Sequence, residues 1–242
     1  MISNGKFYES QFEEATIELL REAHWQYAFG DDIHRKYTDP LIEEDLRNFL
    51  AVQYKDKNLT TSEMDSIVAN LRNTGGQNDY YALRNTFLLY RDGYDFAYSD
   101  GRSNPFRLEY IDFEHPVHNI FRCVNQFVME QGRENRRPDI LLFINGIPVC
   151  IIELKNPTKQ NATIHDAHTQ ICTRYMRDIP ALLKYCALAV ISDGAKNALG
   201  ATYTPFEFFY EWKKIENEDK AGKGLDTLRT LIRGAISPER IL

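Results

Sequence analysis

Three residues in the stretch RRPDILLFINGIPVCIIELKNPTKQ (residues 136–160) have types and spacing suited to holding a divalent cation. Glu153 and Lys155 are two positions apart in the apolar run VCIIELK, so on a strand they point to one face while their neighbours point to the other. Burying charges in an apolar strand is costly unless something compensates for them, and a metal ion is one compensator. Asp139, at the start of the preceding apolar run, can supply a second carboxylate.

The chemistry that these residues can support is hydrolysis of a phosphodiester. Two convergent carboxylates are hard oxygen ligands that suit Mg²⁺, so we expect Asp139 and Glu153 to bind this ion. A bound Mg²⁺ lowers the pKa of a coordinated water and stabilises charge on phosphate oxygens. Lys155 can position the attacking water in the same cleft. This assembly needs no covalent enzyme intermediate.

The site exists only if the strand register brings the carboxylates to one face. Asn145-Gly146 predicts a hairpin between the two apolar runs. A regular two-residue loop sets Asp139 opposite Ile152, on the wrong face. A three-residue loop that ends in a G1 bulge at Gly146 instead sets Asp139 opposite Ile151, on the right face. We therefore predict an odd-length connection or an equivalent bulge.

The elements around this hairpin predict a mixed α/β fold. Apolar residues at helical spacing indicate four helices in the first half, starting near Ser10, Asp39, Met64 and Leu83. The pattern then changes to short β-branched and aromatic runs, which predict strands within 106–113, 120–129, 139–144, 149–155 and 187–192. Helices are predicted over 166–179 and 206–217. This order favours a mixed β-sheet with helices packed against it.

Composition limits the class of protein. With 242 residues, of which 43% are hydrophobic, the chain can bury a substantial core. It has neither a signal peptide nor an apolar run long enough to span a bilayer, so we expect a cytoplasmic protein with no membrane contact. The four cysteines have no metal-ligand spacing and are expected to be reduced and buried. The 35 acidic against 29 basic residues argue against a wholly basic surface.

A local basic groove remains possible beside the candidate site. Arg133, Arg136 and Arg137 precede the motif and Lys159 follows it. These four cations are candidates for contacts to a nucleic-acid backbone. The alternative is a solvated basic loop, which is the commoner role of such residues.

The stretch RPDILLFINGIPVCIIELKNP resembles the PD-(D/E)XK nuclease motif of the restriction (R) subunit of type I restriction-modification enzymes. Pro138-Asp139 and Glu153-Leu154-Lys155 are the two halves of the motif. The segments EYIDFEHPVHNIFRCVNQF, DGAKNALGATYTPFEFFYEWK and LRTLIRGAISPERIL resemble the same subunit, so the resemblance covers roughly residues 1–242. It implies a restriction-endonuclease-like core with a helical N-terminal elaboration.

The resemblance implies a function and partners for the longer protein. It implies the endonuclease component of an ATP-dependent, DNA-translocating enzyme that cuts duplex DNA and assembles with methyltransferase (M) and specificity (S) subunits. No GxxxxGK[ST] phosphate loop occurs here, so we expect ATP and the motor domain to belong to the full-length polypeptide only. The expected layout is an endonuclease domain at 1–225, its helical elaboration within about 35–92, and at 226–242 the start of a linker towards the motor.

The family also places auxiliary residues near the motif. It has a Gln and a Tyr spaced QxxxY, whereas this chain has Gln170 and Tyr175 with one extra residue between them. In a regular α-helix Gln170 shares a face with Arg174, and one of the pair is then excluded. A single π-bulge would absorb the extra residue and reunite Gln170 with Tyr175. Related nucleases carry a Glu on an N-terminal helix, and Glu13 is the best match.

Other interpretations stay open. The domain can be a noncatalytic docking or nucleic-acid-binding module of the same complex, or a nuclease that acts on RNA or single strands. Glu13 can instead form a capping box with Ser10. The pairs His115/His118 and His165/His168 suggest metal binding only weakly, because neither has a third ligand at a recognisable spacing.

Overall fold

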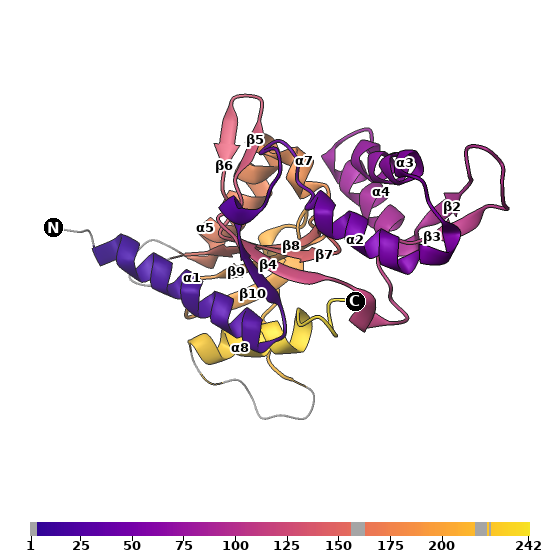
Figure 1. Cartoon of the computed structure of the whole chain (residues 1–242). Helices are drawn as coiled ribbons and strands as arrows, with labels where there is room; N and C mark the ends of the chain where they lie inside the picture. Colours follow the sequence, from indigo (N-terminus) through magenta and orange to yellow (C-terminus); the bar gives the residue numbers. More distant parts are fainter. Residues whose placement is uncertain (1–3, 156–162, 216–221, 223) are drawn as a thin grey trace.

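The computed structural model describes residues 4–155, 163–215, 222 and 224–242, and a six-stranded mixed sheet lies at its centre (Figure 1). The strands lie in the order β1-β4-β7-β8-β9-β10, in which β1/β4 and β8/β9 are parallel pairs and the others antiparallel. Their bounds are β1 (Gln26–Phe29), β4 (Phe121–Asn125), β7 (Ile140–Ile144), β8 (Ile147–Leu154), β9 (Leu188–Ser192) and β10 (Asn197–Ala201). The predicted mixed sheet is confirmed.

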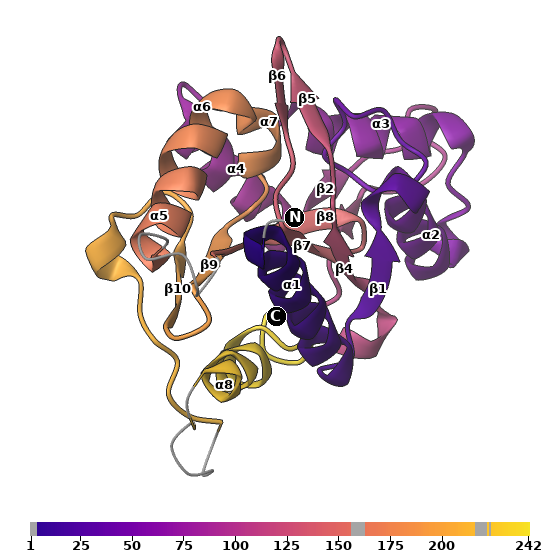
Figure 2. The same cartoon turned by 90° about the vertical axis from the view of Figure 1, so that its left-hand side faces the viewer.

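Helices cover both faces of this sheet, which explains why β7 and β8 are almost entirely apolar. Ile140 and Leu142 pack in the cluster that includes α1 (Asn4–Glu22) and α8 (Leu225–Ala235). Leu141 and Phe143 pack in the other cluster, with α5 (Ile164–Thr169), a π-helical turn η4 (Gln170–Tyr175) and α7 (Pro180–Leu183). The short helix α6 (Met176–Asp178) follows η4. In Figure 2, α1 crosses in front of the sheet with α8 beside it.

The remaining helices form a lobe at one side of the sheet, on the right in Figure 1. It contains α2 (Glu43–Gln53), α3 (Thr61–Asn73), α4 (Asp79–Asp92) and a small sheet of β2 (Tyr94–Phe96) and β3 (Phe106–Leu108). A capping box between Thr60 and Glu63 begins α3, and Gly93, at φ 68°, ends α4. The three helices lie within the predicted elaboration at 35–92.

Shorter elements complete the chain. The strands β5 (Met129–Gln131) and β6 (Glu134–Arg136) form a separate hairpin that projects beyond the sheet in Figure 2. The 3-10 turns are η1 (Gly30–Asp32), η2 (Lys55–Lys57), η3 (Pro116–His118) and η5 (Phe206–Phe208).

Two local predictions are wrong. Helix α1 begins at Asn4, so Ser10 lies inside it and cannot cap it at Glu13. The helix predicted over 206–217 is absent from the described residues 206–215, where only the short turn η5 is helical. The chain instead runs beside β10, because Leu199 and Tyr210 exchange two backbone hydrogen bonds of 2.9 and 3.0 Å.

The segment predicted as a linker, residues 226–242, contains most of α8. Leu228, Leu231 and Ile232 are buried in the core, and the indole nitrogen of Trp25 donates to the carbonyl of Ile236 at 2.9 Å. The start of this segment is therefore part of the packed domain. The boundary at residue 225 stays a prediction.

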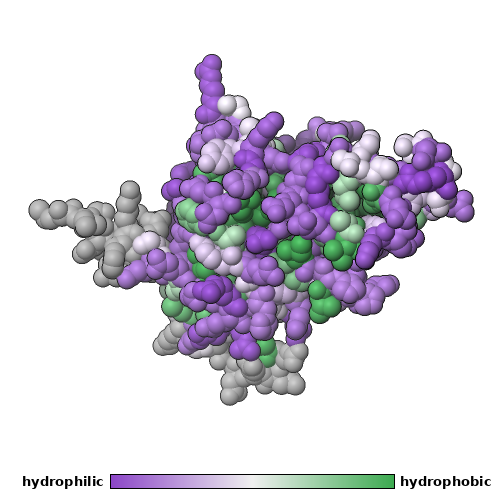
Figure 3. Space-filling view, in the orientation of Figure 1, coloured by the Kyte–Doolittle hydropathy of each residue, from purple (hydrophilic) through white to green (hydrophobic). Residues whose placement is uncertain are grey.

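The surface agrees with the predicted globular class. Figure 3 shows a largely hydrophilic face on which the apolar areas are small and scattered. Among the residues that the structure describes, none of the helices combines the length and the apolar character that crossing a bilayer requires. All four cysteines are free, three of them are buried, and Cys172 is partly exposed.

Candidate functional site

The β7–β8 hairpin sets the register on which the site depends. Its loop has two residues, Asn145 and Gly146, both left-handed at φ 50° and 76°, so the predicted three-residue loop is wrong. The ladder shifts by one position between Leu142 and Phe143, and the resulting bulge confirms the alternative prediction. It occurs next to Pro148, which has no N–H to offer a regular ladder.

The bulge brings the predicted residues to one face. Beyond it Ile140 pairs with Ile152, so the next position sets Asp139 opposite Glu153. Asp139 Oδ2 accepts the backbone N–H of Leu154 at 2.7 Å. The Lys155 ammonium lies 2.7 Å from Glu153 Oε1, and the Glu153 side chain is 1% exposed. The structure therefore brings Asp139, Glu153 and Lys155 together.

The π-helical turn adds the auxiliary pair. Residues 170–175 form a π-helix, so residues five apart share a face, and the predicted π-bulge is confirmed. Gln170 Nε2 donates to the Tyr175 hydroxyl at 2.7 Å, and Gln170 Oε1 accepts from Lys155 Nζ at 2.7 Å. The Tyr175 hydroxyl donates to Glu153 Oε2 at 3.2 Å. A closed ring of hydrogen bonds thus joins Lys155, Gln170, Tyr175 and Glu153.

Glu13 reaches the sheet from α1. Its Oε1 accepts from Asn125 Nδ2 at 2.7 Å and from Gln126 Nε2 at 2.9 Å. The Tyr27 hydroxyl donates to Asn125 Oδ1 at 3.0 Å, which orients the amide towards Glu13. Sequence reasoning missed Tyr27, Asn125 and Gln126 as partners of this site. The signal that could have found two of them is the polar pair in VNQF, where an apolar strand ends.

The electrostatics of the site favour a cation. Burial, reinforced by the negative charge of Glu153, raises the pKa of Asp139 well above its ordinary value, although the N–H of Leu154 opposes the shift. The charge of Glu13 adds to this rise. Burial and the charge of Glu153 also raise the pKa of Tyr175. The site thus contains three carboxylates, those of Asp139, Glu153 and Glu13, and one ammonium, that of Lys155. The carboxylates are a donor set of hard oxygens that fits Mg²⁺.

The predicted backbone-contact residues differ in their surroundings. Arg136 Nε donates to Asp178 Oδ2 at 2.7 Å, and Arg136 also pairs with Glu134 at 2.5 Å. Arg136 therefore ties the β5–β6 hairpin to α6. Arg133 and Arg137 are exposed. Lys159 lies outside the described residues, and contact of any of the four with DNA stays a prediction.

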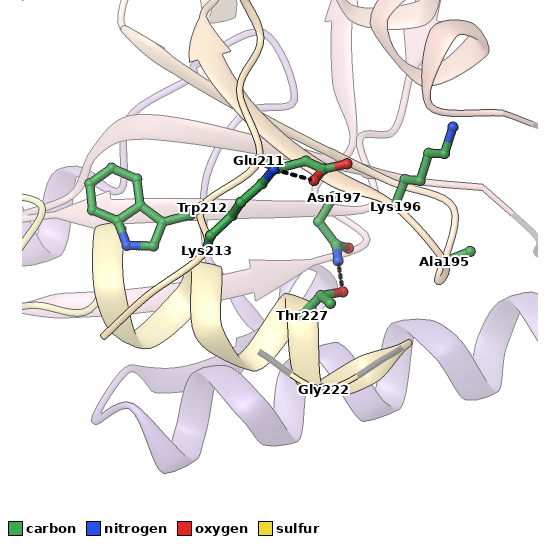
Figure 4. Close-up of a pocket in the computed structure, with 8 residues that line it drawn as sticks. All are labelled: Ala195, Lys196, Asn197, Glu211, Trp212, Lys213, Gly222 and Thr227. Carbon is green, nitrogen blue, oxygen red and sulfur yellow. Dashed lines mark hydrogen bonds and ion pairs between the residues drawn. The ribbon is translucent and has the colours of Figure 1, made fainter. Parts of the chain in front are cut away.

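A separate pocket lies between β10, the segment 211–213 and α8 (Figure 4). Asn197 Nδ2 donates to the Thr227 hydroxyl there, and Lys213 lies 3.6 Å from Glu211. None of the predicted site residues is among the described residues that line this pocket. It contributes nothing to the arrangement around Glu153.

Comparisons with known proteins place the chain among related sequences. A family model described as "Type I restriction enzyme R protein N terminus" matches residues 6–208. The chain is 31% identical to the type I restriction enzyme HindI endonuclease subunit of Haemophilus influenzae, over 97% of this chain and 23% of that protein. It is 30% identical to a putative type I restriction enzyme MjaIXP endonuclease subunit of Methanocaldococcus jannaschii, over 86% of this chain and 20% of that protein. The chain therefore spans about a fifth of the length of these relatives.

Proposed function

This chain belongs to the family of type I restriction enzyme R protein N termini, and from that premise we propose that it is a Mg²⁺-dependent endonuclease domain acting on duplex DNA. The observation that carries the proposal is the convergence of Asp139, Glu153 and Lys155 at one end of the β7–β8 hairpin. Asp139 directly precedes β7 and Glu153 lies in the adjacent strand β8, so the fold itself holds the two carboxylates together.

In the proposed mechanism, Asp139 and Glu153 hold the metal. A Mg²⁺ ion held there would supply a water of lowered pKa and would offset the charge of the phosphate oxygens. The Lys155 ammonium donates a hydrogen bond to the attacking water or to a phosphate oxygen in the transition state. The water oxygen forms the new bond to phosphorus and releases one proton to solvent, the bond to the leaving sugar oxygen breaks, and that oxygen takes a proton from solvent. No enzyme side chain becomes covalently bound.

The hydrogen-bonded ring explains how these groups keep their positions. Gln170 accepts from Lys155 and Tyr175 donates to Glu153, so the ammonium and the carboxylate are each held by a second residue. Side chains fixed in this way lose little further freedom when the substrate binds. We assign Gln170 and Tyr175 a positioning role, and Glu13 an auxiliary role beside Asp139.

The proposal extends to the longer protein. We propose that this domain is joined to an ATP-dependent motor in the same polypeptide, and that M and S subunits complete a cytoplasmic complex. Within residues 226–242, the part that follows the packed helix α8 would lead towards the motor. Arg133, Arg137 and Lys159 are the proposed backbone contacts, with Arg136 held mainly by its ion pairs.

The test is Lys155→Ala in the full-length protein, assembled with its M and S subunits. Loss of this ammonium should reduce double-strand cleavage by about 100-fold or more, while ATP hydrolysis stays near the wild-type rate. Lys196→Ala, at an exposed lysine of the β9–β10 turn, is the matched control and should cut normally.

Undiminished cleavage by Lys155→Ala would contradict the nuclease assignment and favour a noncatalytic docking module. Comparing Mg²⁺-dependent degradation of duplex DNA, single-stranded DNA and RNA tests the substrate. Preference for single strands or RNA would overturn the duplex assignment.

A further inference from the structure

One aspartate and two histidines gather at the opposite end of the β7–β8 hairpin from Glu153. The ligand atoms of Asp112, His115 and His118 all lie within 4.8 Å of one another. His118 Nδ1 is 2.8 Å from Asp112 Oδ2, and His115 Nδ1 is 3.6 Å from Asp112 Oδ1. The two imidazoles stack with centroids 5.0 Å apart. The fold thus supplies the third ligand that the spacing of the histidine pair alone does not indicate.

Local structure explains this convergence. His115 precedes the 3-10 turn Pro116–His118, in which residues three apart lie one above the other. Pro116 occupies the first position of the turn, where its missing N–H costs nothing. The two rings therefore face the same side of the turn, above Asp112.

The carboxylate is held before any ligand arrives. Asp112 has a side chain that is 5% exposed, and its oxygens accept from the backbone N–H of His115 at 2.8 Å and from Gln53 Nε2 at 3.2 Å. Asn119 fixes the backbone of Asp112, accepting its N–H at 2.9 Å and donating to its carbonyl at 2.7 Å. These hydrogen bonds therefore hold the Asp112 carboxylate in one position.

The imidazoles remain open to solvent. The side chains of His115 and His118 are 61% and 50% exposed, so water can occupy further coordination positions beside them. Two imidazoles and one carboxylate are the donors of many zinc sites with one open position. In such a site metal–ligand bonds of about 2.0–2.1 Å hold neighbouring ligand atoms about 3.3 Å apart. His118 Nδ1 lies 2.8 Å from Asp112 Oδ2 and His115 Nδ1 lies 3.6 Å from Asp112 Oδ1, so each imidazole is near this separation from one carboxylate oxygen.

We propose that Asp112, His115 and His118 bind one divalent transition-metal ion, at a site separate from the nuclease centre. Imidazole nitrogens favour ions such as Zn²⁺ over Mg²⁺, which prefers oxygen ligands. Asn119 Oδ1 accepts from Asn145 Nδ2 at 2.7 Å, so the site adjoins the hairpin turn. Six residues of extended strand separate Asn145 from Asp139, or about 20 Å. One ion cannot serve both sites.

The position suggests what the ion does. Gln53 belongs to α2 in the helical lobe, whereas Asn119 lies two residues before β4 in the central sheet. An ion held by residues 112–118 would tie the connection between the lobe and the sheet. Binding to the folded protein alone would therefore stabilise it.

The experiment uses Zn²⁺ alone as the probe. The chelator-treated chain is titrated by calorimetry without Mg²⁺, alongside the double variant His115→Asn/His118→Asn. Asn retains a hydrogen-bonding group beside Asp112 but removes the imidazoles. We expect the wild type to bind one more equivalent of Zn²⁺ than the double variant, and Zn²⁺ to raise the melting temperature of the wild type only. Equal stoichiometry and affinity would overturn the proposal.

Two controls identify the site. His24→Asn/His34→Asn removes two exposed histidines elsewhere, and Asn tolerates the positive φ of 71° at His24, so Zn²⁺ binding should be unchanged. Asp139→Asn/Glu153→Gln should also retain it. If Asp139→Asn/Glu153→Gln loses the extra equivalent of bound Zn²⁺ instead, the ion belongs to the nuclease centre and the proposal fails. If His115→Asn alone, a change at the more exposed ring, leaves affinity unchanged, the two-imidazole site is likewise excluded.

Discussion

The buried polar groups at the two ends of the β7–β8 hairpin differ in how well they are paired. At the turn, the fully buried Asn145 accepts the N–H of Ile120 at 2.7 Å and donates to Tyr110 and Asn119 at 3.0 and 2.7 Å. At the other end, burial and the charge of the facing Glu153 raise the pKa of Asp139. Satisfied neutral groups stabilise the fold, whereas convergent like charges cost stability and favour a cation between them.

The largest expected change in stability is at Asn145, in the hairpin turn. Asn145→Ala leaves the N–H of Ile120 and the carbonyl of Tyr110 without their amide partner and puts Ala in a left-handed conformation. We expect the free energy of unfolding to fall by about 3 kcal/mol, because each orphaned buried group costs about 1–3 kcal/mol. Urea denaturation measures this loss.

A matched control separates hydrogen bonding from backbone strain. Asn58 has a similar φ of 48° but is exposed, and its side chain makes one long bond of 3.3 Å to the carbonyl of Asp56. Asn58→Ala should therefore cost about 1 kcal/mol, the strain contribution alone. Equal losses at both positions would show that the bonds of Asn145 contribute little.

A smaller effect is expected at the network that holds Glu13. Asn125→Ala removes the link from the Tyr27 hydroxyl to the Glu13 carboxylate, and of the residues that the structure describes, Gln126 is then the one that still donates to Glu13. We expect DNA cleavage by the assembled enzyme to fall about tenfold, the lower range for losing a residue that orients a metal-site group. Asn135→Ala, at an exposed amide 3.4 Å from Glu130, should cut normally. A normal rate for Asn125→Ala would remove Glu13 from the site.

A smaller effect still, of the opposite sign, is expected at Asp139. The folded protein holds a proton on Asp139 more tightly than the unfolded chain does, so metal-free protein loses stability as the pH rises through this raised pKa. Asp139→Asn removes that loss, and we expect the metal-free variant to be more stable than wild type at neutral pH, while Mg²⁺ no longer adds stability. Denaturation with chelator and with Mg²⁺, at acidic and neutral pH, measures both effects.

The pKa of Asp166 is shifted in the opposite direction from that of Asp139. It caps α5, and hydrogen bonds from the backbone and side chain of Thr163 lower its pKa. Its stabilising contribution is present above the ordinary carboxyl pKa and is lost as the pH falls through the lowered one. Asp166→Asn should therefore destabilise the protein at neutral pH. A stability change of the same sign in both variants would contradict the proposed like-charge repulsion at Asp139.

The sequence predicted the elements whose apolar pattern is strong. The runs that became β7, β8 and β9 are almost continuously apolar, because helices cover both faces of the sheet. The short edge strands β1 and β10 escaped prediction, since QYAF and NALGA carry too few apolar residues to show a period. Aromatic spacing in 206–215 resembled a helix, although Phe209 in fact fills the space over Gly200.

The candidate site was predictable where spacing alone decides geometry. Glu153 and Lys155 share a face on any strand, and the need for a bulge followed from the face that Asp139 must reach. The choice between a longer loop and a bulge was not predictable, because it depends on how Pro148 and Gly146 fit their neighbours. A Cβ at Gly146 would lie 2.1 Å from the carbonyl oxygen of Ile42. The partners of Glu13 depend on contacts more than 100 residues apart.

The extra residue between Gln170 and Tyr175 offers the smallest expected effect. The π-turn absorbs this residue, so deleting the exposed Thr173 should convert 170–175 to regular α-helix and leave the helix beyond it in place. Gln170 and the tyrosine then become i,i+4 neighbours on one face, and we expect cleavage to remain near the wild-type rate. Deleting Ser66, an exposed residue of the regular helix α3, should instead turn Ile67 and Leu71 out of the core and unfold the lobe. If the Thr173 deletion abolishes cleavage in a folded protein, the five-residue spacing itself is required, and the ring around Glu153 depends on the π-helical geometry.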